Sequence, residues 1–499
     1  MRRRQFLRLT GAACAALSTP LNAAPSGSGR FKGAGGETIS VSKAEIDALT
    51  RNIVGQVFRP GDAAYDSART IWNARIDHRP KLIIRAQSQA DVVHAVNFAR
   101  ESGVELSVRG GGHNHAGFAV SDGGVMLDMA SMRKATVNAD EKHIAIDAGS
   151  TFAEFDALTH EAGLAATGPI VSMVGLPGYT LGGGIGWLHR KFGAGCDNLQ
   201  GAEIVLASGD IVRANERENE DLLWALRGGG GNFGIVTRLE YRLHELSHVL
   251  AGLIFYPLDQ LDNIGAFVDD YLDDAPDNLN VWMLHRMAPP SPALPSEIHG
   301  TPVLILAVTW SGQEAEGERM IAPLRRYAEP LVDLVRWRPY PEWQGALDGA
   351  WGDGFCNEWV GGYLNSYDAN TRAVIQSFVS DASSPISDFK LARLGGEFAR
   401  TGPQDTAFGF RDARYAYVIQ TRWPKSEDGT SHLKWTYDFH SKMQQHDTGN
   451  VYSNFIGKDE PANRVADAFE KPAHQRLRRI KASYDPENFF RQNHNIKPE

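Results

Sequence analysis

A glycine-rich loop at residues 108–117 constrains the fold of this chain more than any other segment. The segment Val104–Val108 reads as a strand, and Arg109, three consecutive glycines and His113 follow it directly. Because glycine has no Cβ, successive backbone N–H groups of such a loop can point into one concavity and bind phosphate oxygens. A plain glycine-rich turn is the alternative for three glycines alone, so the rest of the chain has to decide.

Classical NAD binding is the first function that the glycines exclude. A Rossmann loop needs Gly-x-Gly-x-x-Gly at the start of a helix. In the first cluster His115 stands where the third glycine belongs. The second cluster, Gly182–Gly186, fails as well, because Trp187 and His189 occupy the required positions.

The hydrophobic pattern divides the chain into two parts. Up to about residue 247 short strand-like runs alternate with amphipathic helices, and Ser88 and Thr151 stand where helices begin. From about residue 250 longer runs, such as Thr301–Trp310 and Tyr415–Trp423, alternate with helical stretches such as Gly317–Tyr327. A chain of 499 residues is also too long for one ordinary core. We therefore expect an α+β protein with lobes at 41–247 and 248–450 and a C-terminal segment at 451–499.

The N-terminus predicts an export signal. Residues 1–24 hold Arg3-Arg4-Gln5-Phe6-Leu7, then a mildly apolar stretch and two alanines, and this order resembles a twin-arginine (Tat) signal peptide. An ordinary Sec signal is the alternative. Residues 25–40 are small, polar and glycine-rich, so a disordered linker is expected there. These features predict export by the Tat route to the periplasm or the extracellular space.

Charge and hydropathy narrow the class of partner. Removing the four arginines of residues 1–24 changes the formal net charge from −9 to −13. A protein this acidic repels nucleic acid and anionic membrane surfaces. No run of 18 or more apolar residues is present, so no membrane association is expected after export.

Four stretches of the chain each resemble a different motif of one protein family: Arg109–Gly117, Gly182–Leu199, Trp224–Thr237 and Tyr484–Asn495. Together, and in this order, they resemble the berberine bridge enzyme-like proteins of the vanillyl-alcohol oxidase/p-cresol methylhydroxylase (PCMH) type of FAD-linked oxidases. The resemblance implies a PCMH-type FAD-binding lobe, and a substrate lobe whose antiparallel sheet is covered by helices. It also implies that the C-terminal segment returns to the FAD lobe.

The resemblance further implies how FAD is held. In that family a histidine at the place of His113 bonds the flavin 8α-methyl carbon, and a cysteine at the place of Cys196 bonds ring carbon 6. A disulfide between Cys196 and Cys356 is the alternative in an oxidising compartment. No metal site is expected, because no carboxylate or cysteine stands at ligand spacing with His115 or His189. The other predicted FAD contacts are Arg109, Gly110, Gly111, Gly112, Asn114, Gly117, Pro177, Gly178, Gly182, Gly183, Gly184, Gly186, Val236, Asn493 and Asn495.

The segment Val451–Phe455 carries the one catalytic candidate. It is similar to the family's Tyr-x-Asn segment, which implies that Tyr452 lies over the flavin ring. There a phenolate could accept a hydroxyl proton, and stacking without a proton role is the alternative. The aromatic residues expected to line the substrate cleft are Trp351, Trp359, Tyr363 and Tyr417.

These observations predict an FAD-dependent oxidase that acts on a hydroxylated small molecule, such as a sugar, an alcohol or a phenolic or polycyclic natural product. Hydride would pass to flavin N5, and O₂ would be reduced to H₂O₂. Two alternatives stay open: a dehydrogenase of the same fold that uses another acceptor, and a non-catalytic flavin-bearing periplasmic sensor.

Overall fold

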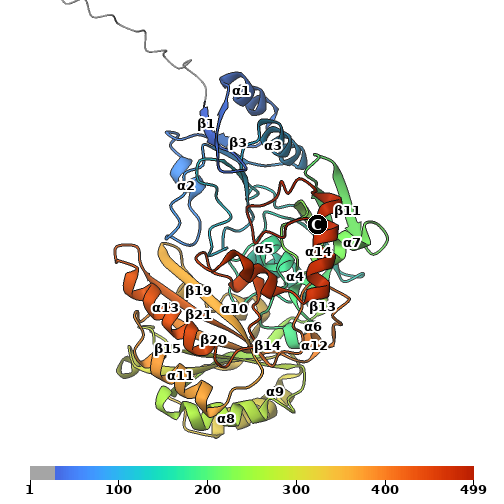
Figure 1. Cartoon of the computed structure of the whole chain (residues 1–499). Coiled ribbons are helices and arrows are strands. Elements are labelled where there is room, and N and C mark those ends of the chain that lie inside the picture. Colours follow the sequence, from blue (N-terminus) through green and yellow to red (C-terminus); the bar gives the residue numbers. More distant parts are fainter. Residues whose placement is uncertain (1–28) are drawn as a thin grey trace, which may run out of the picture.

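The computed structural model describes residues 29–499, so the predicted signal peptide at 1–24 lies outside the described residues. The chain forms two lobes (Figure 1). The upper lobe in that view contains most of residues 29–247 and helix α14 (Lys471–Tyr484), and the lower lobe is built on one large sheet. The α+β, two-lobed fold class is confirmed.

Two sheets form the first lobe. A four-stranded sheet has the order β3 (Gln56–Phe58), β4 (Leu82–Arg85), β6 (Val125–Asp128) and β5 (Leu106–Arg109). An antiparallel five-stranded sheet has the order β11 (Ile211–Asn215), β10 (Leu199–Val205), β12 (Ile235–Arg242), β8 (His143–Asp147) and β7 (Ala135–Asn138). The short strands β9 (Leu164–Ala165) and β13 (His244–Glu245) pair with each other. The helices of this lobe are α1 (Lys43–Asn52), α2 (Tyr65–Arg69), α3 (Gln89–Ser102), α4 (Phe152–Glu161), α5 (Leu176–Leu181), α6 (His189–Phe192) and α7 (Glu220–Leu226).

Local chemistry explains where these helices begin. Ser88 caps α3 with a complete capping box, because its hydroxyl accepts from the Asp91 backbone and the Asp91 side chain accepts from the Ser88 backbone. Thr151 occupies the same position before α4. Strands β4 and β6 pair in parallel and are almost wholly apolar, as expected for strands buried on both faces.

One antiparallel sheet forms the second lobe. Its order is β17 (Val332–Asp333), β14 (His248–Pro257), β16 (Pro302–Trp310), β15 (Leu279–Met287), β20 (Asp388–Arg393), β21 (Tyr415–Pro424) and β19 (Phe355–Leu364), and β18 (Arg336–Pro339) also pairs with β14. The helices of this lobe are α8 (Leu261–Tyr271), α9 (Glu314–Arg326), α10 (Tyr340–Gln344), α11 (Ala369–Ser380), α12 (Glu397–Arg400) and α13 (Thr430–Met443).

The two faces of this sheet have different partners. Val281 and Met283 of β15 belong to a core that helices α8, α9, α11 and α13 complete on the outer face, at the bottom of Figure 1. Trp282 and Leu284, which alternate with them, belong to a second core that faces the first lobe. The inner face of the sheet therefore forms the boundary between the lobes.

The predicted disordered linker is wrong from residue 29 onward. Strands β1 (Gly29–Lys32) and β2 (Thr38–Val41) form an antiparallel hairpin. Phe31 and Val41 are buried in the core of the first lobe, and Lys32 exchanges backbone hydrogen bonds with Gly123 and Glu105. Apolar burial, together with these backbone hydrogen bonds, therefore attaches the hairpin to the first lobe.

The C-terminal segment packs on the first lobe, where α14 contacts α7. Lys481 on α14 is completely buried, and its Nζ donates to the Asp485 carboxylate at 2.6 Å and to the backbone oxygens of Asn232 and Phe490 at 2.6 and 2.9 Å. Asn232 in turn donates to the His494 carbonyl at 3.2 Å. These contacts join the last residues of the chain to the loop that precedes β12.

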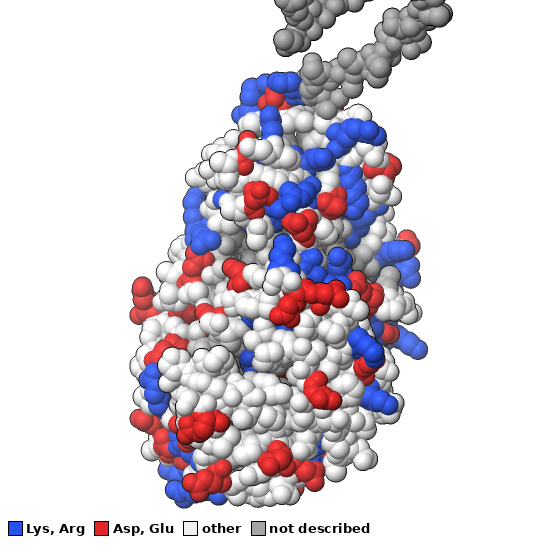
Figure 2. Space-filling model, turned by 90° about the vertical axis from the view of Figure 1, so that its left-hand side faces the viewer, with Lys and Arg blue, Asp and Glu red and all other residues white. Residues whose placement is uncertain are grey.

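Acidic and basic side chains are interspersed over the face shown in Figure 2, without a continuous basic surface. None of the helices in residues 29–499 has the length and apolar character needed to cross a membrane.

Candidate active site

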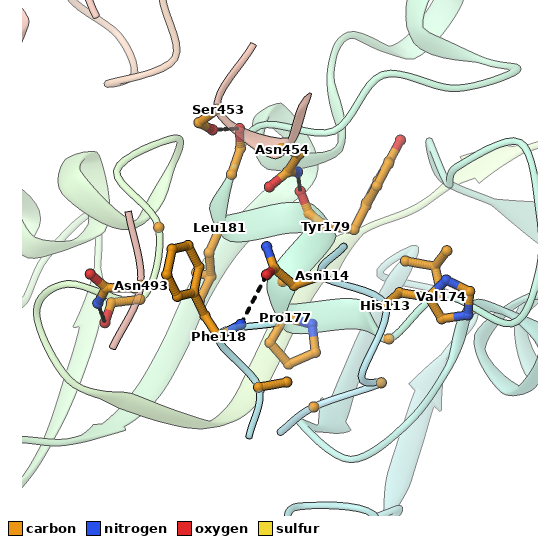
Figure 3. Close-up of a pocket in the computed structure, with 18 of the residues that line it drawn as sticks. His113, Asn114, Phe118, Val174, Pro177, Tyr179, Leu181, Ser453, Asn454 and Asn493 are labelled. Carbon is orange, nitrogen blue, oxygen red and sulfur yellow. Dashed lines mark hydrogen bonds between the residues drawn. The ribbon is translucent and has the colours of Figure 1, made fainter. Parts of the chain in front are cut away.

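A cavity with a volume of about 350 Å³ lies between the two lobes. Glycine loops of the first lobe, the inner face of the large sheet and the C-terminal segment all contribute to its wall. In Figure 3 His113 and Val174 lie at one end, Asn493 lies at the other, and Asn114 and Phe118 lie between them. The size of the cavity is typical of ligand pockets.

The loop after β5 reaches this cavity because its base is fixed. Arg109 makes a two-point ion pair with the buried Asp128 carboxylate at the end of β6, at 3.0 and 2.5 Å. Beyond this pair the backbones of Gly111 and Gly175 touch, and a Cβ on Gly111 would lie 2.3 Å from the Gly175 nitrogen. Glycine is required at both positions for two loops to meet at one wall of the cavity.

Eleven of the predicted site residues line the cavity. They are Gly110, Gly111, Gly112, His113, Asn114, Pro177, Gly178, Gly182, Val236, Tyr452 and Asn493.

The other predicted contacts do not line the cavity. Arg109 instead anchors the loop through Asp128. Gly186 packs against Gly168, whose carbonyl oxygen would lie 1.7 Å from an added Cβ. Close packing or turn geometry in the same loops likewise explains Gly117, Gly183 and Gly184, and Cys196 and Asn495 also lie outside the lining.

His113 stacks on Trp72, with ring centroids 5.1 Å apart and planes 22° from parallel. Burial lowers the pKa of His113 to about 4, because a charged imidazolium is poorly solvated there. The ring is therefore neutral at physiological pH, the form in which an imidazole nitrogen is nucleophilic.

Cys196 lies in a 3₁₀ turn (Gly195–Asn198) and is completely buried. The Arg411 guanidinium is ion-paired with Asp197 at 2.7 Å and lies 3.9 Å from the Cys196 sulfur. Burial raises the pKa of the thiol, and Arg411 opposes that shift. Cys196 and Cys356 are both buried free cysteines, so the alternative of a disulfide between them is wrong for this structure.

Tyr452 brings a phenolic oxygen to the cavity from the C-terminal segment. That oxygen accepts hydrogen bonds from the Gly184 backbone N–H at 2.9 Å and from Asn454 Nδ2 at 2.7 Å. Burial raises the pKa of Tyr452 above its ordinary value, and the two donors act in the opposite direction because they stabilise the phenolate.

The inner face of the large sheet supplies the remaining wall. Trp351 and Trp359 line the cavity, as predicted. Tyr363 and Tyr417 do not: Tyr363 packs against Phe410, and Tyr417 points to the outer face of the sheet.

Sequence reasoning missed several lining residues, among them Trp282, Lys390 and Gln420. The one signal for Lys390 is its position in the middle of the otherwise strand-like run Asp388–Arg393.

The residues present fit a flavin nucleotide in two respects. Gly178 and Gly231 line the cavity, and a Cβ added at either would meet no nearby protein atom within 4 Å, so both backbones face open space. Buried polar atoms without protein partners stand along the same wall: Tyr179 OH, Asn493 Oδ1 and His494 Nε2. Such atoms need a ligand or water as partner. Within residues 29–499 no group of His, Cys, Asp and Glu is arranged to hold a metal ion.

Comparisons with known proteins agree with this geometry. Residues 80–215 match the family described as "FAD binding domain", and residues 451–497 match "Berberine and berberine like". The chain is 31% identical to (R)-6-hydroxynicotine oxidase of Paenarthrobacter nicotinovorans over 466 residues, which cover 91% of this chain and 98% of the relative.

The solved structures with a similar fold include two oxidases. The crystal structure of 6-hydroxy-D-nicotine oxidase from Arthrobacter nicotinovorans has a TM-score of 0.81 and 28% identity, and covers 90% of this chain and 98% of its own. A glucooligosaccharide oxidase from Acremonium strictum, with a 6-S-cysteinyl, 8α-N1-histidyl FAD, shares the fold at a TM-score of 0.79 and 21% identity, with 91% of this chain and 99% of its own covered. The chain therefore belongs to the berberine bridge enzyme-like family of FAD-linked oxidoreductases.

Proposed function

We propose that this enzyme is an oxidase whose FAD is bonded to both His113 and Cys196 and whose substrate is a hydroxylated small molecule. FAD held by His113 and the glycine loops would supply the redox chemistry, which is acceptance of a hydride from the substrate at flavin N5 and transfer of two electrons to O₂ to give H₂O₂. The observation that carries the proposal is the convergence of His113, the glycine loops and Tyr452 on one cavity.

The environments of His113 and Cys196 support two attachment points. His113 is neutral, lines the cavity and is held in place by Trp72. Cys196 is packed in the same buried cluster as Tyr452, with the Arg411 guanidinium close enough to stabilise a thiolate. The glucooligosaccharide oxidase of the same fold has both kinds of bond.

Tyr452 is the group that we propose takes the substrate's hydroxyl proton at its phenolic oxygen. Its two hydrogen-bond donors fix the position of that oxygen and would compensate the charge of a phenolate. Because the side chain is only 2% exposed, bulk water is a poor substitute for it as proton acceptor.

One experiment tests the attachment directly. The purified protein is denatured in acid and its polypeptide mass is measured, together with that of His113→Ala, Cys196→Ala and the double variant. We expect FAD to remain on the wild type and on each single variant, and to be released only from the double variant. An unmodified wild-type mass with free yellow flavin in solution would refute the proposal. Peroxide formation with O₂, compared with reduction of an artificial acceptor, separates oxidase from dehydrogenase.

We further propose that the folded protein leaves the cytoplasm by the Tat route. Supporting this is the Arg3-Arg4 pair, followed by an apolar stretch. Replacing both Arg3 and Arg4 by lysine should leave flavin-loaded precursor in the cytoplasm. Export of this lysine variant at the wild-type level would contradict the proposal.

A further inference from the structure

The inner face of the large sheet carries an unbalanced cluster of buried charges beside the cavity. In the register of the sheet, Arg286 on β15 lies opposite Asp388 on β20. Lys390 lies two residues along β20, and Arg422 lies on the neighbouring strand β21. These side chains are buried, with Lys390 3% and Asp388 1% exposed. Three cations are thus set against Asp388 and, at Arg422, the exposed Asp353, so the cluster keeps an excess of positive charge.

Lys390 is the member of this cluster that faces the cavity. Its Nζ lies 2.6 Å from Asp388 and also donates to Gln420 Oε1. Its ammonium group lies over the ring of Trp351, 4.7 Å from the centroid. Among the described residues that line the cavity, Lys390 is the only Lys, Arg, Asp or Glu.

The neutral groups around Lys390 are hydrogen-bond donors without acceptors. Gln420 Oε1 already accepts from Trp351 Nε1 at 2.8 Å and from Lys390, which leaves its Nε2 without a partner. The indole nitrogens of Trp282 and Trp359 are also buried and unpartnered. All these donors belong to residues of the cavity wall. A ligand that satisfies them has to bring acceptor atoms, and one that balances the charge has to bring a negative charge.

We propose that the substrate of this enzyme carries a carboxylate, and that Lys390 and Gln420 bind this group on the sheet side of the cavity. The donors stand among flat aromatic faces, which suits an acid built on an aromatic or sugar ring. The assignment rests on the proposed oxidase function and adds the substrate class to it: hydroxy acids rather than neutral alcohols.

A pH dependence follows from the same geometry. Burial lowers the pKa of Lys390 to about 8, with Arg286 and Arg422 acting in the same direction and Asp388 opposing them. Lysine is a cation below its pKa, so the preference for an anion is present at neutral pH and is lost as the pH rises through that value. A bound carboxylate raises the pKa of Lys390, which moves the loss to higher pH.

The test uses benzoate and benzamide as probes, because they have nearly the same shape and differ in charge. Calorimetry on the purified holoenzyme measures both affinities without any turnover. We expect benzoate to bind roughly ten- to a hundredfold more tightly at neutral pH, as a charge-assisted hydrogen bond would give. We expect Lys390→Met to remove the preference and the exposed control Lys442→Met to keep it. Gln420→Glu, which adds a carboxylate beside Lys390 with little change of shape, should weaken benzoate more than benzamide.

Three results would overturn the assignment. The first is equal affinity for the two probes in the wild type, a comparison that needs no variant to fold. The second is a Lys390→Met enzyme that loses affinity for both probes equally, which would make the lysine a packing residue. The third is a Lys390→Met enzyme that binds benzoate as the wild type does but has a shifted flavin reduction potential, which would assign Lys390 to the cofactor. A protein that prefers benzoate but oxidises no hydroxylated compound, neutral or acidic, would refute the oxidase proposal and leave the anion site standing, whereas one that oxidises only neutral alcohols would refute the carboxylate assignment.

Discussion

Replacing Tyr452 by phenylalanine should slow reduction of the flavin by substrate about 10²–10⁴-fold, the usual contribution of a general base, while the flavin stays bound. In the structure the phenolic oxygen has two hydrogen-bond donors and no hydrogen-bond acceptor among the described protein atoms, and Tyr452 lines the cavity. The substitution removes that oxygen from a site with almost no solvent. The rate loss corresponds to about 3–5 kcal/mol of transition-state free energy.

The assay is rapid anaerobic mixing with a substrate that bleaches the wild-type flavin, followed through the visible absorbance. Tyr363→Phe is the matched control, because Tyr363 is equally buried and its hydroxyl has no partner, so its loss should cost little. Burial raises the pKa of Tyr452, so the growth of the phenolate fraction with pH is shifted to alkaline pH. The wild-type rate should therefore increase toward alkaline pH, and the Tyr452→Phe rate should not.

The reasoning is refuted if Tyr452→Phe reduces its flavin as fast as Tyr363→Phe does. A loss of stability would be a separate effect, because Gly184 N–H and Asn454 Nδ2 lose their acceptor in the variant. Removing the partner of a buried donor costs about 1–3 kcal/mol of folding free energy, which thermal unfolding would detect without substrate.

Three further predictions concern the frame of the site. Lys481→Met leaves the buried carboxylate four residues later without its cation and should lower the free energy of unfolding by about 3–5 kcal/mol, measured by urea denaturation; an unchanged midpoint would contradict this. Gly111→Ala places a Cβ 2.3 Å from the Gly175 nitrogen and should lower the ratio of flavin to protein absorbance, which a fully loaded variant would contradict. Cys196→Ala should keep its flavin through His113 but oxidise substrate more slowly, and an unchanged rate would show that the cysteine bond has no catalytic role.

Much of the fold could be predicted because its signals are local. Ser88 and Thr151 stand at helix starts, and the continuous apolar run within Thr301–Trp310 gives the strand β16. The hairpin at residues 29–41 could not be predicted, since its two buried residues, Phe31 and Val41, are ten positions apart in a polar segment. Only their contact with the distant edge of the first lobe orders them.

The parts of the site formed by the backbone of a glycine motif could be predicted. The parts formed by side chains that are far apart in the sequence could not. The glycine loops and His113 could be found from sequence, but Arg109 was misplaced because its partner, Asp128, lies on another strand. Lys390 was missed because a lysine inside a strand ordinarily indicates an exposed face. Lys390 is buried because the first lobe packs on that face of the sheet. The hydrophobic pattern of a strand does not show which part of the chain packs on each face.

The docking of the C-terminal segment has a consequence for biosynthesis. A nascent polypeptide can form every glycine turn of the first lobe and still lack one side of the cavity, because Tyr452, Asn493 and His494 are translated after both lobes. The cavity is therefore completed only when the C-terminal segment has been made and α14, held by Lys481, has docked on the first lobe. A polypeptide without this segment would lack one wall of the cavity and the part of the first-lobe core to which Leu477 and Ile480 belong, so retained colour would report that the segment is present and docked.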